Sequence, residues 1–385
     1  MKKIILSFLT LLAFVYTTKA QHLQLTRNAE VSVITVEPGN DLVDSFGHSA
    51  FRVRDPFLSV DYVYNYGTYD FNTPNFYGKF AQGKLLYDLG ISRFSNFLQY
   101  YASQNRTVVE QILALSKEEK QQFFEFLQNN ARPENKSYLY DFFFDNCATK
   151  LRDVSDEILT QKIQFNYTFD ETNLTFRDLI HKYLDEQAWG KFGIDLALGS
   201  VIDRKATPQE YSFLPDYIYK NFEKGSINNK PLVRLTRTLF TSEPNEKKHS
   251  YFTPFMLFSL LAILVLWITY KDYKADKRSR WLDFSIFFFT GIVGLLVLLL
   301  WFATDHSATA KNYNALWAMA PNVFVAFLML KKELKNWLKK YVSLLIVLIV
   351  VTLILWIQKI QVFSIVLVPI LLMLTVRYIF LSKKI

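Results

Sequence analysis

The chain has 385 residues, a formal net charge of +9 and a single cysteine, Cys147. One cysteine excludes an internal disulfide. The positive charge lies in Lys2-Lys3, in two short basic loops and at the C-terminus, and together these segments exceed the net charge of the whole chain. The remainder is slightly acidic and lacks the basic face of a nucleic-acid-binding protein, so we expect no nucleic-acid partner.

The first twenty residues have the pattern of a secretory signal peptide. Residues 1–20 combine Lys2-Lys3 with an apolar core and the small-residue ending Thr18-Lys-Ala20. The apolar core is too short to span a bilayer comfortably. We therefore expect the mature chain to begin near Gln21, outside the cytoplasm. An uncleaved N-terminal anchor is the alternative.

Residues 21–249 have the composition of an exported globular domain. Alternating apolar residues predict strands at Val31–Val36, from about His48 to Val53, and at Val60–Gly67. If the second and third strands form a hairpin centred between Pro56 and Phe57, Asn65 lies opposite His48. Opposed residues share a face of the sheet, so Asn65 would orient the imidazole. The rest of this domain is predicted to be mainly helical.

Cys147 lies where a helix is predicted to begin. Asp145 and Asn146 are good N-cap types, and residues 148–159 follow with a helical apolar period. Unpaired N–H groups and the helix dipole at such a position favour the thiolate, which is the nucleophilic form of cysteine. The alternative is a buried cysteine that acts as a small hydrophobic residue.

Residues 250–385 are predicted to form a transmembrane helical domain of about five spans. The apolar segments lie at about Phe252–Tyr270, Leu282–Phe302, Ala315–Leu330, Val342–Ile357 and Val362–Leu381. The loops 271–281 and 331–340 hold five Lys or Arg residues each, and the C-terminus is also basic. By the positive-inside rule these segments are cytoplasmic. The domain of residues 21–249 and the loop 304–314 would then share the outer side.

The outer loop, residues 304–314, carries more polar residues than a connector between two spans needs. His306, Asn312 and Asn314 stand out in it. One interpretation is a loop at the membrane surface with solvated side chains. The other is that the loop faces the exported domain and holds a polar group of a lipid or peptide at the bilayer boundary.

Three stretches and the layout of the chain resemble a known family. The stretches are Phe46-Gly-His-Ser-Ala-Phe-Arg-Val53, Tyr64-Asn-Tyr-Gly67 and Asp145-Asn-Cys-Ala-Thr-Lys-Leu-Arg152. His48 before Cys147 resembles a circularly permuted papain-like fold of the NlpC type, which reverses the usual order of Cys and His. Lecithin:retinol acyltransferase and its relatives share that order and move an acyl chain from a phospholipid onto the cysteine. With the signal peptide, the multi-span tail and the outer loop, the chain is more closely similar to membrane-bound lipoprotein N-acyltransferases of the Lnb type.

This resemblance implies an α+β permuted papain-like catalytic domain on the periplasmic side, followed by a multi-pass α-helical bundle in the bacterial inner membrane. Cys147 would be the nucleophile and His48 its base, and Asn65 is added from the hairpin argument. The implied reaction moves an acyl chain from a phospholipid, through a Cys147 thioester, to the α-amine of a diacylglyceryl-cysteine lipoprotein. We expect no metal or cofactor. The residues expected to bind substrate are His306, Asn312, Asn314 and Asn146.

Two other classes of function remain open at this point. A membrane-anchored papain-like cysteine peptidase or amidase acting on cell-wall peptide would use the same Cys147 and His48 with water as the acceptor. The polar outer loop argues against a simple tether, which needs no such loop. A non-enzymatic membrane protein would leave Cys147 as a core residue, and its replacement would then leave function intact.

Overall fold

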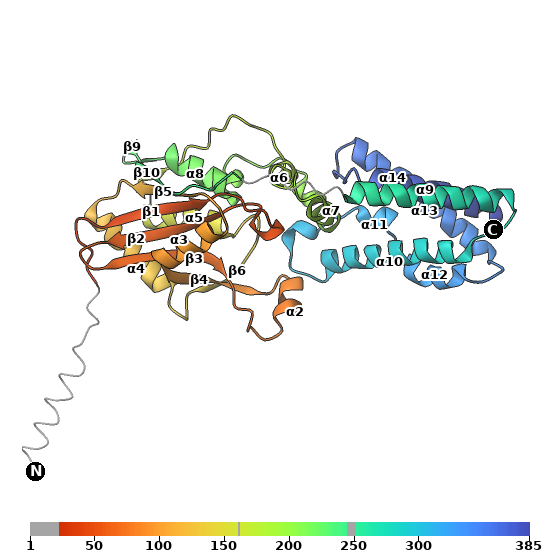
Figure 1. Cartoon of the computed structure of the whole chain (residues 1–385), viewed down its shortest axis with the longest axis horizontal. Helices are drawn as coiled ribbons and strands as arrows, with labels where there is room; N and C mark the ends of the chain where they lie inside the picture. Colours follow the sequence, from red (N-terminus) through yellow and green to blue (C-terminus); the bar gives the residue numbers. More distant parts are fainter. Residues whose placement is uncertain (1–22, 161, 245–251) are drawn as a thin grey trace, which may run out of the picture.

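The computed structural model describes residues 23–160, 162–244 and 252–385. An α+β domain comes first and a helical bundle follows, and the two lie end to end (Figure 1). The predicted signal peptide at residues 1–20 lies outside the described residues. The predicted domain boundary at 249–250 also falls outside them.

The α+β domain is built on a seven-stranded antiparallel sheet in the order β10-β5-β1-β2-β3-β4-β6. The strands are β1 (Glu30–Val36), β2 (His48–Asp55), β3 (Val60–Thr68), β4 (Leu86–Arg93), β5 (Val108–Leu113), β6 (Ser137–Leu139) and β10 (Val233–Phe240). A small second sheet joins β7 (Ile163–Gln164), β8 (Ser226–Ile227) and β9 (Lys230–Pro231). Because β10 pairs with β5, the exported domain extends to at least Phe240.

Both faces of the sheet are covered by helices. One face packs against helices with apolar residues at helical spacing: α4 (Lys117–Asn130), α5 (Cys147–Ile158) and α8 (Pro215–Glu223). The other face packs against α3 (Phe94–Ser103). Strand β1 is buried on both faces, which explains its almost continuous apolar sequence.

The three predicted strands are confirmed as β1, β2 and β3, but the predicted hairpin register is wrong by two residues. Asp55 pairs with Val60 and Phe51 with Tyr64, so one step further along Asn65 lies opposite Ala50 rather than His48. The turn spans residues 56–59 and closes through Ser59, which has a positive φ of 55°. A shift of two residues keeps the same face of the sheet, so Asn65 and His48 still point to one side.

The expectation that the rest of the domain is mainly helical is only partly met. The predicted capping box at Ser116 is present and opens α4. Strands β4, β5 and β10, however, lie in the region that was predicted to be mainly helical. The remaining helices of the domain are short: α2 (Phe76–Ala81), α6 (Phe176–His181) and α7 (Ala188–Ala197), with the 3-10 turns η1 (Leu42–Asp44), η2 (Ser200–Ile202) and η3 (Glu210–Phe213).

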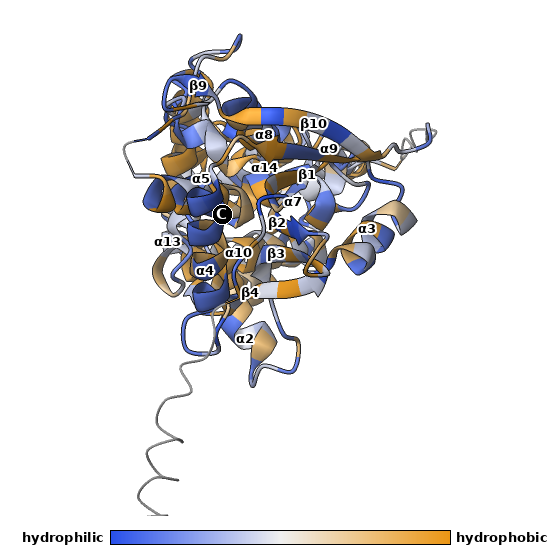
Figure 2. Ribbon diagram, turned by 90° about the vertical axis from the view of Figure 1, so that its left-hand side faces the viewer, coloured by the Kyte–Doolittle hydropathy of each residue, from blue (hydrophilic) through white to orange (hydrophobic). Residues whose placement is uncertain are grey.

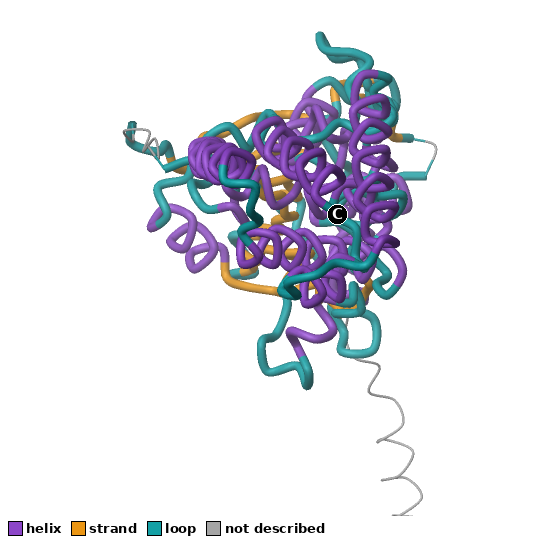
Figure 3. The backbone as a smooth tube through the Cα atoms, turned by 90° about the vertical axis from the view of Figure 1, so that its right-hand side faces the viewer, coloured by secondary structure: helices purple, strands orange, loops and turns teal. Residues whose placement is uncertain are grey.

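The C-terminal region is a helical bundle that agrees with the prediction of about five spans (Figure 1). Its elements are α9 (Pro254–Lys274), α10 (Arg280–Phe302), η4 (Ser307–Thr309), α11 (Asn314–Trp317), α12 (Asn322–Met329), α13 (Asn336–Ile357) and α14 (Leu367–Lys384). Within the described residues, α9, α10 and α13 are long and apolar enough to cross a membrane. The basic connections and the C-terminus lie at the end far from the sheet, and in the end-on view the helices cover the strands behind them (Figure 3).

The third crossing is broken rather than continuous, which explains its short apolar stretch. Helices α11 and α12 are separated by residues 318–321. Gly294 of α10 packs closely on this break, and Gly291 packs on the start of α12. A Cβ at either glycine would collide with backbone atoms of the broken segment. Small residues allow this close approach of two backbones inside a bilayer.

Candidate active site

Cys147 is the first residue of α5, as predicted, and the preceding residue caps the helix. The side-chain oxygen of Asn146 accepts hydrogen bonds from the N–H groups of Ala148 and Thr149, both at 2.9 Å. The Thr149 hydroxyl in turn accepts from the Asn146 N–H at 2.8 Å. A cap of this kind is worth about 1 kcal/mol. It leaves the N–H of Cys147 unused by the cap at the positive end of the helix.

The amide nitrogen of Asn146 is engaged as well. It donates to the carbonyl oxygens of Phe142 and Phe213, and the residue is 3% exposed. The contacts therefore support a role in positioning Cys147. Substrate binding by Asn146 stays a prediction, and this structure leaves its side chain no free polar atom for it.

His48 is the first residue of β2, and its imidazole is held on both sides. Its Nε2 lies 2.5 Å from Oδ1 of Asn65 on β3, and its ring stacks against Tyr101 of α3 with ring centroids 6.0 Å apart. The imidazole and the Cys147 thiol also shift each other's pKa, so the two side chains interact. Since Nε2 faces Asn65, Nδ1 is the ring atom left for the thiol. We call Cys147, His48 and Asn65 the thiol site.

The electrostatics of the thiol site shift the pKa values of the thiol and the imidazole toward each other. Burial alone would raise the pKa of the Cys147 thiol, but His48 and the N–H groups of Ser49 and Ala148 outweigh it and lower that pKa below its ordinary value. Burial alone would lower the pKa of His48, but Cys147 and Asn65 raise it above its ordinary value. Shifts in these two directions are typical of a cysteine that a neighbouring histidine activates.

Tyrosines surround the thiol site, and sequence reasoning did not single them out. The ring of Tyr140 and the Cβ of Cys147 both lie within 4 Å of where a Cβ on Gly67 would stand, and the Tyr138 hydroxyl lies at the same limit. Within the part of the chain that the structure describes, this buried hydroxyl has no hydrogen-bond partner. The signal in the sequence is Tyr138 and Tyr140 at strand spacing, just before the helix that carries the thiol.

The outer loop faces the α+β domain, which is one of the two interpretations of the sequence. Asn312 Nδ2 donates to the carbonyl oxygens of Leu196 and Ala197, and Asn314 Nδ2 donates to that of Asp195. These are terminal carbonyls of α7, which lack partners within their own helix. Both asparagines are at most 1% exposed, so they are not solvated.

These contacts bear on the predicted substrate-binding role of Asn312 and Asn314. The polar atoms of both side chains are used between the loop and α7, and Asn312 Oδ1 also accepts from Gln361 and from the Asn314 backbone. The contacts support docking of the loop. Substrate binding by the two residues stays a prediction, and in this structure both amide groups are already hydrogen-bonded within the protein.

A second set of contacts fixes the same end of α7. Buried Arg177 pairs with the carboxylate of Asp195 at 2.9 Å and donates to the carbonyl oxygens of Leu198 and Gly199. The Gly199 N–H in turn donates to Ala308 of the outer loop at 2.9 Å. At the end of α7, the junction between the two regions is therefore held by these hydrogen bonds and by a buried ion pair.

The outer loop also contacts the segment that leads into Cys147. The Ser307 hydroxyl donates to Asp141 at 2.5 Å, and the backbone of Asp141 bridges to Asp145, two residues before the thiol. His306 is half-buried and lies beside Gly83, in the connection between α2 and β4. Among the four predicted substrate-binding residues, His306 differs from the three asparagines, because its side chain has no hydrogen bond to another described residue.

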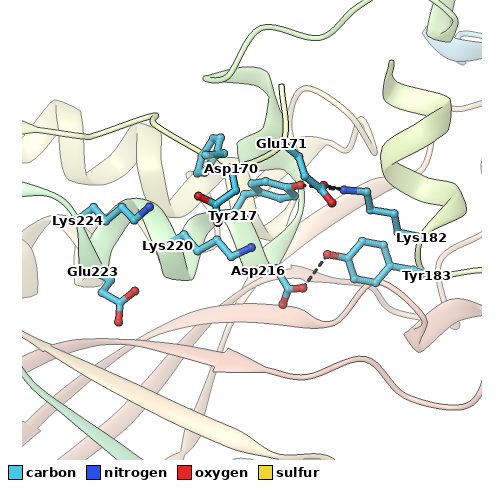
Figure 4. Close-up of a pocket in the computed structure, with 10 residues that line it drawn as sticks. Asp170, Glu171, Lys182, Tyr183, Asp216, Tyr217, Lys220, Glu223 and Lys224 are labelled. Atoms are coloured by element: carbon cyan, nitrogen blue, oxygen red, sulfur yellow. Dashed lines mark hydrogen bonds and ion pairs between the residues drawn. The ribbon is translucent and has the colours of Figure 1, made fainter. Parts of the chain in front are cut away.

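A cavity of about 550 Å³ lies elsewhere, between α6 and α8. Figure 4 shows that its charged groups face one another: Lys182 pairs with Glu171, and the Tyr183 hydroxyl donates to Asp216 at 2.7 Å. Neither Cys147 nor His48 lines it. The cavity therefore brings together none of the predicted site residues.

Comparison with protein families supplies an independent assignment. The model of the Lnb N-terminal periplasmic domain matches residues 18–183, and that of the Lnb transmembrane domain matches residues 245–384. No curated protein and no solved structure matches the chain. The two matches cover most of the chain in the order that the sequence predicts, and they agree with an α+β domain followed by membrane helices. The chain therefore belongs to the Lnb family and is a multi-pass bacterial membrane protein with a periplasmic domain and a lipoprotein N-acyltransferase role.

Proposed function

We propose that the protein moves an acyl chain from a phospholipid of the inner membrane to the α-amine of a diacylglyceryl-cysteine lipoprotein, through a thioester on Cys147. The observation that carries this proposal is the placement of Cys147 at the start of α5, with its pKa lowered by a His48 that Asn65 holds. This site stands in a domain docked to the membrane bundle through the outer loop. A covalent route divides acyl transfer between two substrates into two easier steps.

In the first step the Cys147 thiolate attacks an ester carbonyl of the phospholipid. A carbon–sulfur bond forms and the carbonyl oxygen takes the negative charge. When the ester carbon–oxygen bond breaks, the imidazolium of His48 gives its proton to the departing glycerol oxygen. The products are a lysophospholipid, a thioester on Cys147 and a neutral His48.

The negative oxygen needs donors near the start of α5. The backbone N–H of Cys147 is left unused by the Asn146 cap. We assign a second donor to Tyr138, because its buried hydroxyl lacks a partner among the described residues. Preorganised donors of this kind contribute about 100-fold each to acyl transfer.

In the second step the α-amine of the lipoprotein attacks the thioester. Such an amine has an ordinary pKa near 8, so a reactive neutral fraction is present at neutral pH. Neutral His48 accepts a proton from the attacking nitrogen, the carbon–sulfur bond breaks, and the thiolate–imidazolium pair is restored. Protons therefore balance over the cycle without another reactant. Asn65 holds the imidazole through Nε2 in both steps.

The decisive experiment follows the masses of both products. The purified protein is incubated in detergent with a diacylated lipopeptide and a phospholipid, as wild type and as Cys147→Ala. We expect the wild type to add one acyl mass to the lipopeptide and to release lysophospholipid, and the variant to do neither. A thermal unfolding curve of the variant serves as the control for folding.

Other outcomes would reject the proposal. Lysophospholipid or cleaved peptide without acyl gain would show a hydrolase, with water as the acceptor. Acyl gain that persists in Cys147→Ala would remove the thioester from the mechanism. No change in either protein would return Cys147 to the hydrophobic core.

A further inference from the structure

An unusual surface lies in the connection between β3 and β4. We call residues 69–80 the aromatic segment: Phe71, Tyr77 and Phe80 are 65%, 78% and 52% exposed, while Phe76 is buried beneath them. The segment projects from the body of the domain in two perpendicular views (Figures 1 and 2). Single exposed aromatic residues are common on soluble proteins, but a cluster of them marks an interaction site.

The aromatic segment lies at the membrane end of the domain. Just after it, the carbonyl oxygen of Gln82 accepts a hydrogen bond of 2.8 Å from Asp305 of the outer loop, and Gly83 lies beside His306. The outer loop follows directly on α10, whose final residue Phe302 is 72% exposed. Figure 1 shows α2 next to that end of α10. The segment is therefore level with the point where a membrane helix leaves the bilayer.

A row of rings connects this surface with the thiol site. Tyr69 contacts Phe76 with ring centroids 5.7 Å apart and contacts Tyr87 at 5.4 Å. Tyr87 stacks on Tyr140 at 4.4 Å, and Tyr140 lies beside Cys147 across Gly67. We call Phe76, Tyr69, Tyr87 and Tyr140 the aromatic row. It is a continuous series of contacts from the membrane end of the domain to the nucleophile.

Charge indicates the kind of ligand. Lys79 lies in the last turn of α2, and Lys84 follows four residues after Phe80, with its N–H bonded to the Lys79 carbonyl oxygen. Aromatic side chains next to lysines are typical of protein surfaces at the level of lipid headgroups, where the ammonium groups meet phosphates. A peptide partner without a lipid anchor would not require a surface at the level of the headgroups.

We propose that the aromatic segment inserts into the periplasm-facing leaflet and binds the phospholipid that donates the acyl chain. Its phosphate lies by Lys79 and Lys84, and the acyl chain to be transferred lies along the aromatic row with its ester at Cys147. This inference rests on the proposed function, because the lipid it names is the acyl donor. It adds the place where that lipid leaves the bilayer.

The first test measures contact with lipid and needs no activity. Because Cys147 is the only cysteine, a Cys147→Ala chain with Tyr77→Cys carries one fluorescent label at a chosen place. The matched control is Phe57→Cys in the same background: Phe57 is 69% exposed in the β2–β3 turn, at the opposite end of β2 from His48. Both full-length proteins are reconstituted in phosphatidylglycerol and phosphatidylethanolamine vesicles with or without nitroxide-labelled lipid.

We expect nitroxide lipid to quench the label at position 77 about twofold or more and to leave the label at 57 unchanged. Equal quenching at both positions would overturn the inference, and so would quenching at neither. A label at 77 that responds only to an added lipopeptide would make this surface a protein-docking site and would also overturn it. None of these results bears on Cys147 chemistry, so the proposed function stands or falls separately.

The second test separates lipid delivery from chemistry. The variant combines Phe71→Gln, Tyr77→Gln and Phe80→Gln and leaves buried Phe76 in place. We expect thioester formation from vesicle phospholipid to slow about tenfold or more, because the three rings would no longer contact lipid. Alkylation of Cys147 by iodoacetamide should keep its wild-type rate, and Phe57→Gln should change neither. An unchanged acylation rate in the triple variant would reject the inference, and a lowered alkylation rate would reject it in favour of a folding role.

Discussion

The thiol site and the outer loop both bury asparagine side chains, but the two regions use them differently. In the thiol site, Asn65 bonds an imidazole that interacts with a thiol, so its hydrogen bond ends on a pair of groups that can ionise. In the outer loop, Asn312 and Asn314 bond the last carbonyl oxygens of α7, which have no further chemistry. The partner at the other end of a buried polar contact therefore distinguishes a reactive site from a docking site.

The largest expected effect comes from His48, which carries the proton in both proposed steps. We expect His48→Gln to slow acyl transfer about 1,000-fold, since no other group described beside the thiol can take its place. The rate of acyl gain on a diacylated lipopeptide measures the effect by mass spectrometry. The unfolding temperature is the control, and a variant that keeps more than about a tenth of the wild-type rate would contradict the assignment of the base.

A smaller loss is expected at Asn65, which acts through His48. Asn65→Ala frees the imidazole to turn and should lower kcat about 100-fold with little change in KM. Asn65→Asp should restore part of the rate, because a carboxylate oxygen can accept the same hydrogen bond from Nε2. A rise in KM at constant kcat would instead assign Asn65 to substrate binding.

The comparison can be broken at Asn312. Asn312→Ala removes the donor to the carbonyl oxygen of Ala197 and the nearer of the two donors to that of Leu196, and we expect the free energy of unfolding to fall by about 1–3 kcal/mol. The neighbouring Lys311→Ala, where an exposed side chain is removed, is the matched control. A rise in KM for lipid with unchanged stability would show that Asn312 holds substrate, as the sequence had indicated.

The mildest test changes only pH. Because the pKa of Cys147 is lowered, its thiolate forms below the pH at which an ordinary thiol ionises, and alkylation should reach its plateau early. In His48→Gln the lowering contribution of the imidazole is lost while burial still raises the pKa. The alkylation midpoint should then move to higher pH. A midpoint that does not move would exclude the ion pair.

Local patterns predicted the elements that carry the thiol site. Alternation indicated β2 and β3, and the N-cap residues before Cys147 indicated the start of α5. The register could not be predicted, because the turn after Asp55 contains one residue with a positive φ, Ser59, that no pattern announced. Asn65 was identified correctly as the partner of His48 only because the error was an even number of residues.

Long-range contacts were beyond the reach of the sequence. Strand β10 pairs with β5, more than a hundred residues away, and no local period reveals such a partner. The bonds of Asn312 and Asn314 to α7 have the same origin. Composition showed that these residues are unusual for a connector, but their partners come from another region of the fold. The length of each apolar run, by contrast, was enough to predict a bundle of about five spans.

The docking of the outer loop on α7 has a consequence for choice of acceptor. Its paired amides and carbonyls join the α+β domain to the membrane bundle, so a thioester on Cys147 would lie at a defined distance from the bilayer. The α-amine of a diacylglyceryl-cysteine lies at that distance because its own two acyl chains anchor it in the bilayer. Lysine amines farther along the same polypeptide would lie farther from the bilayer and would not reach the thioester. Selectivity for the acceptor would then depend on the distance of its amine from the bilayer as well as on its shape.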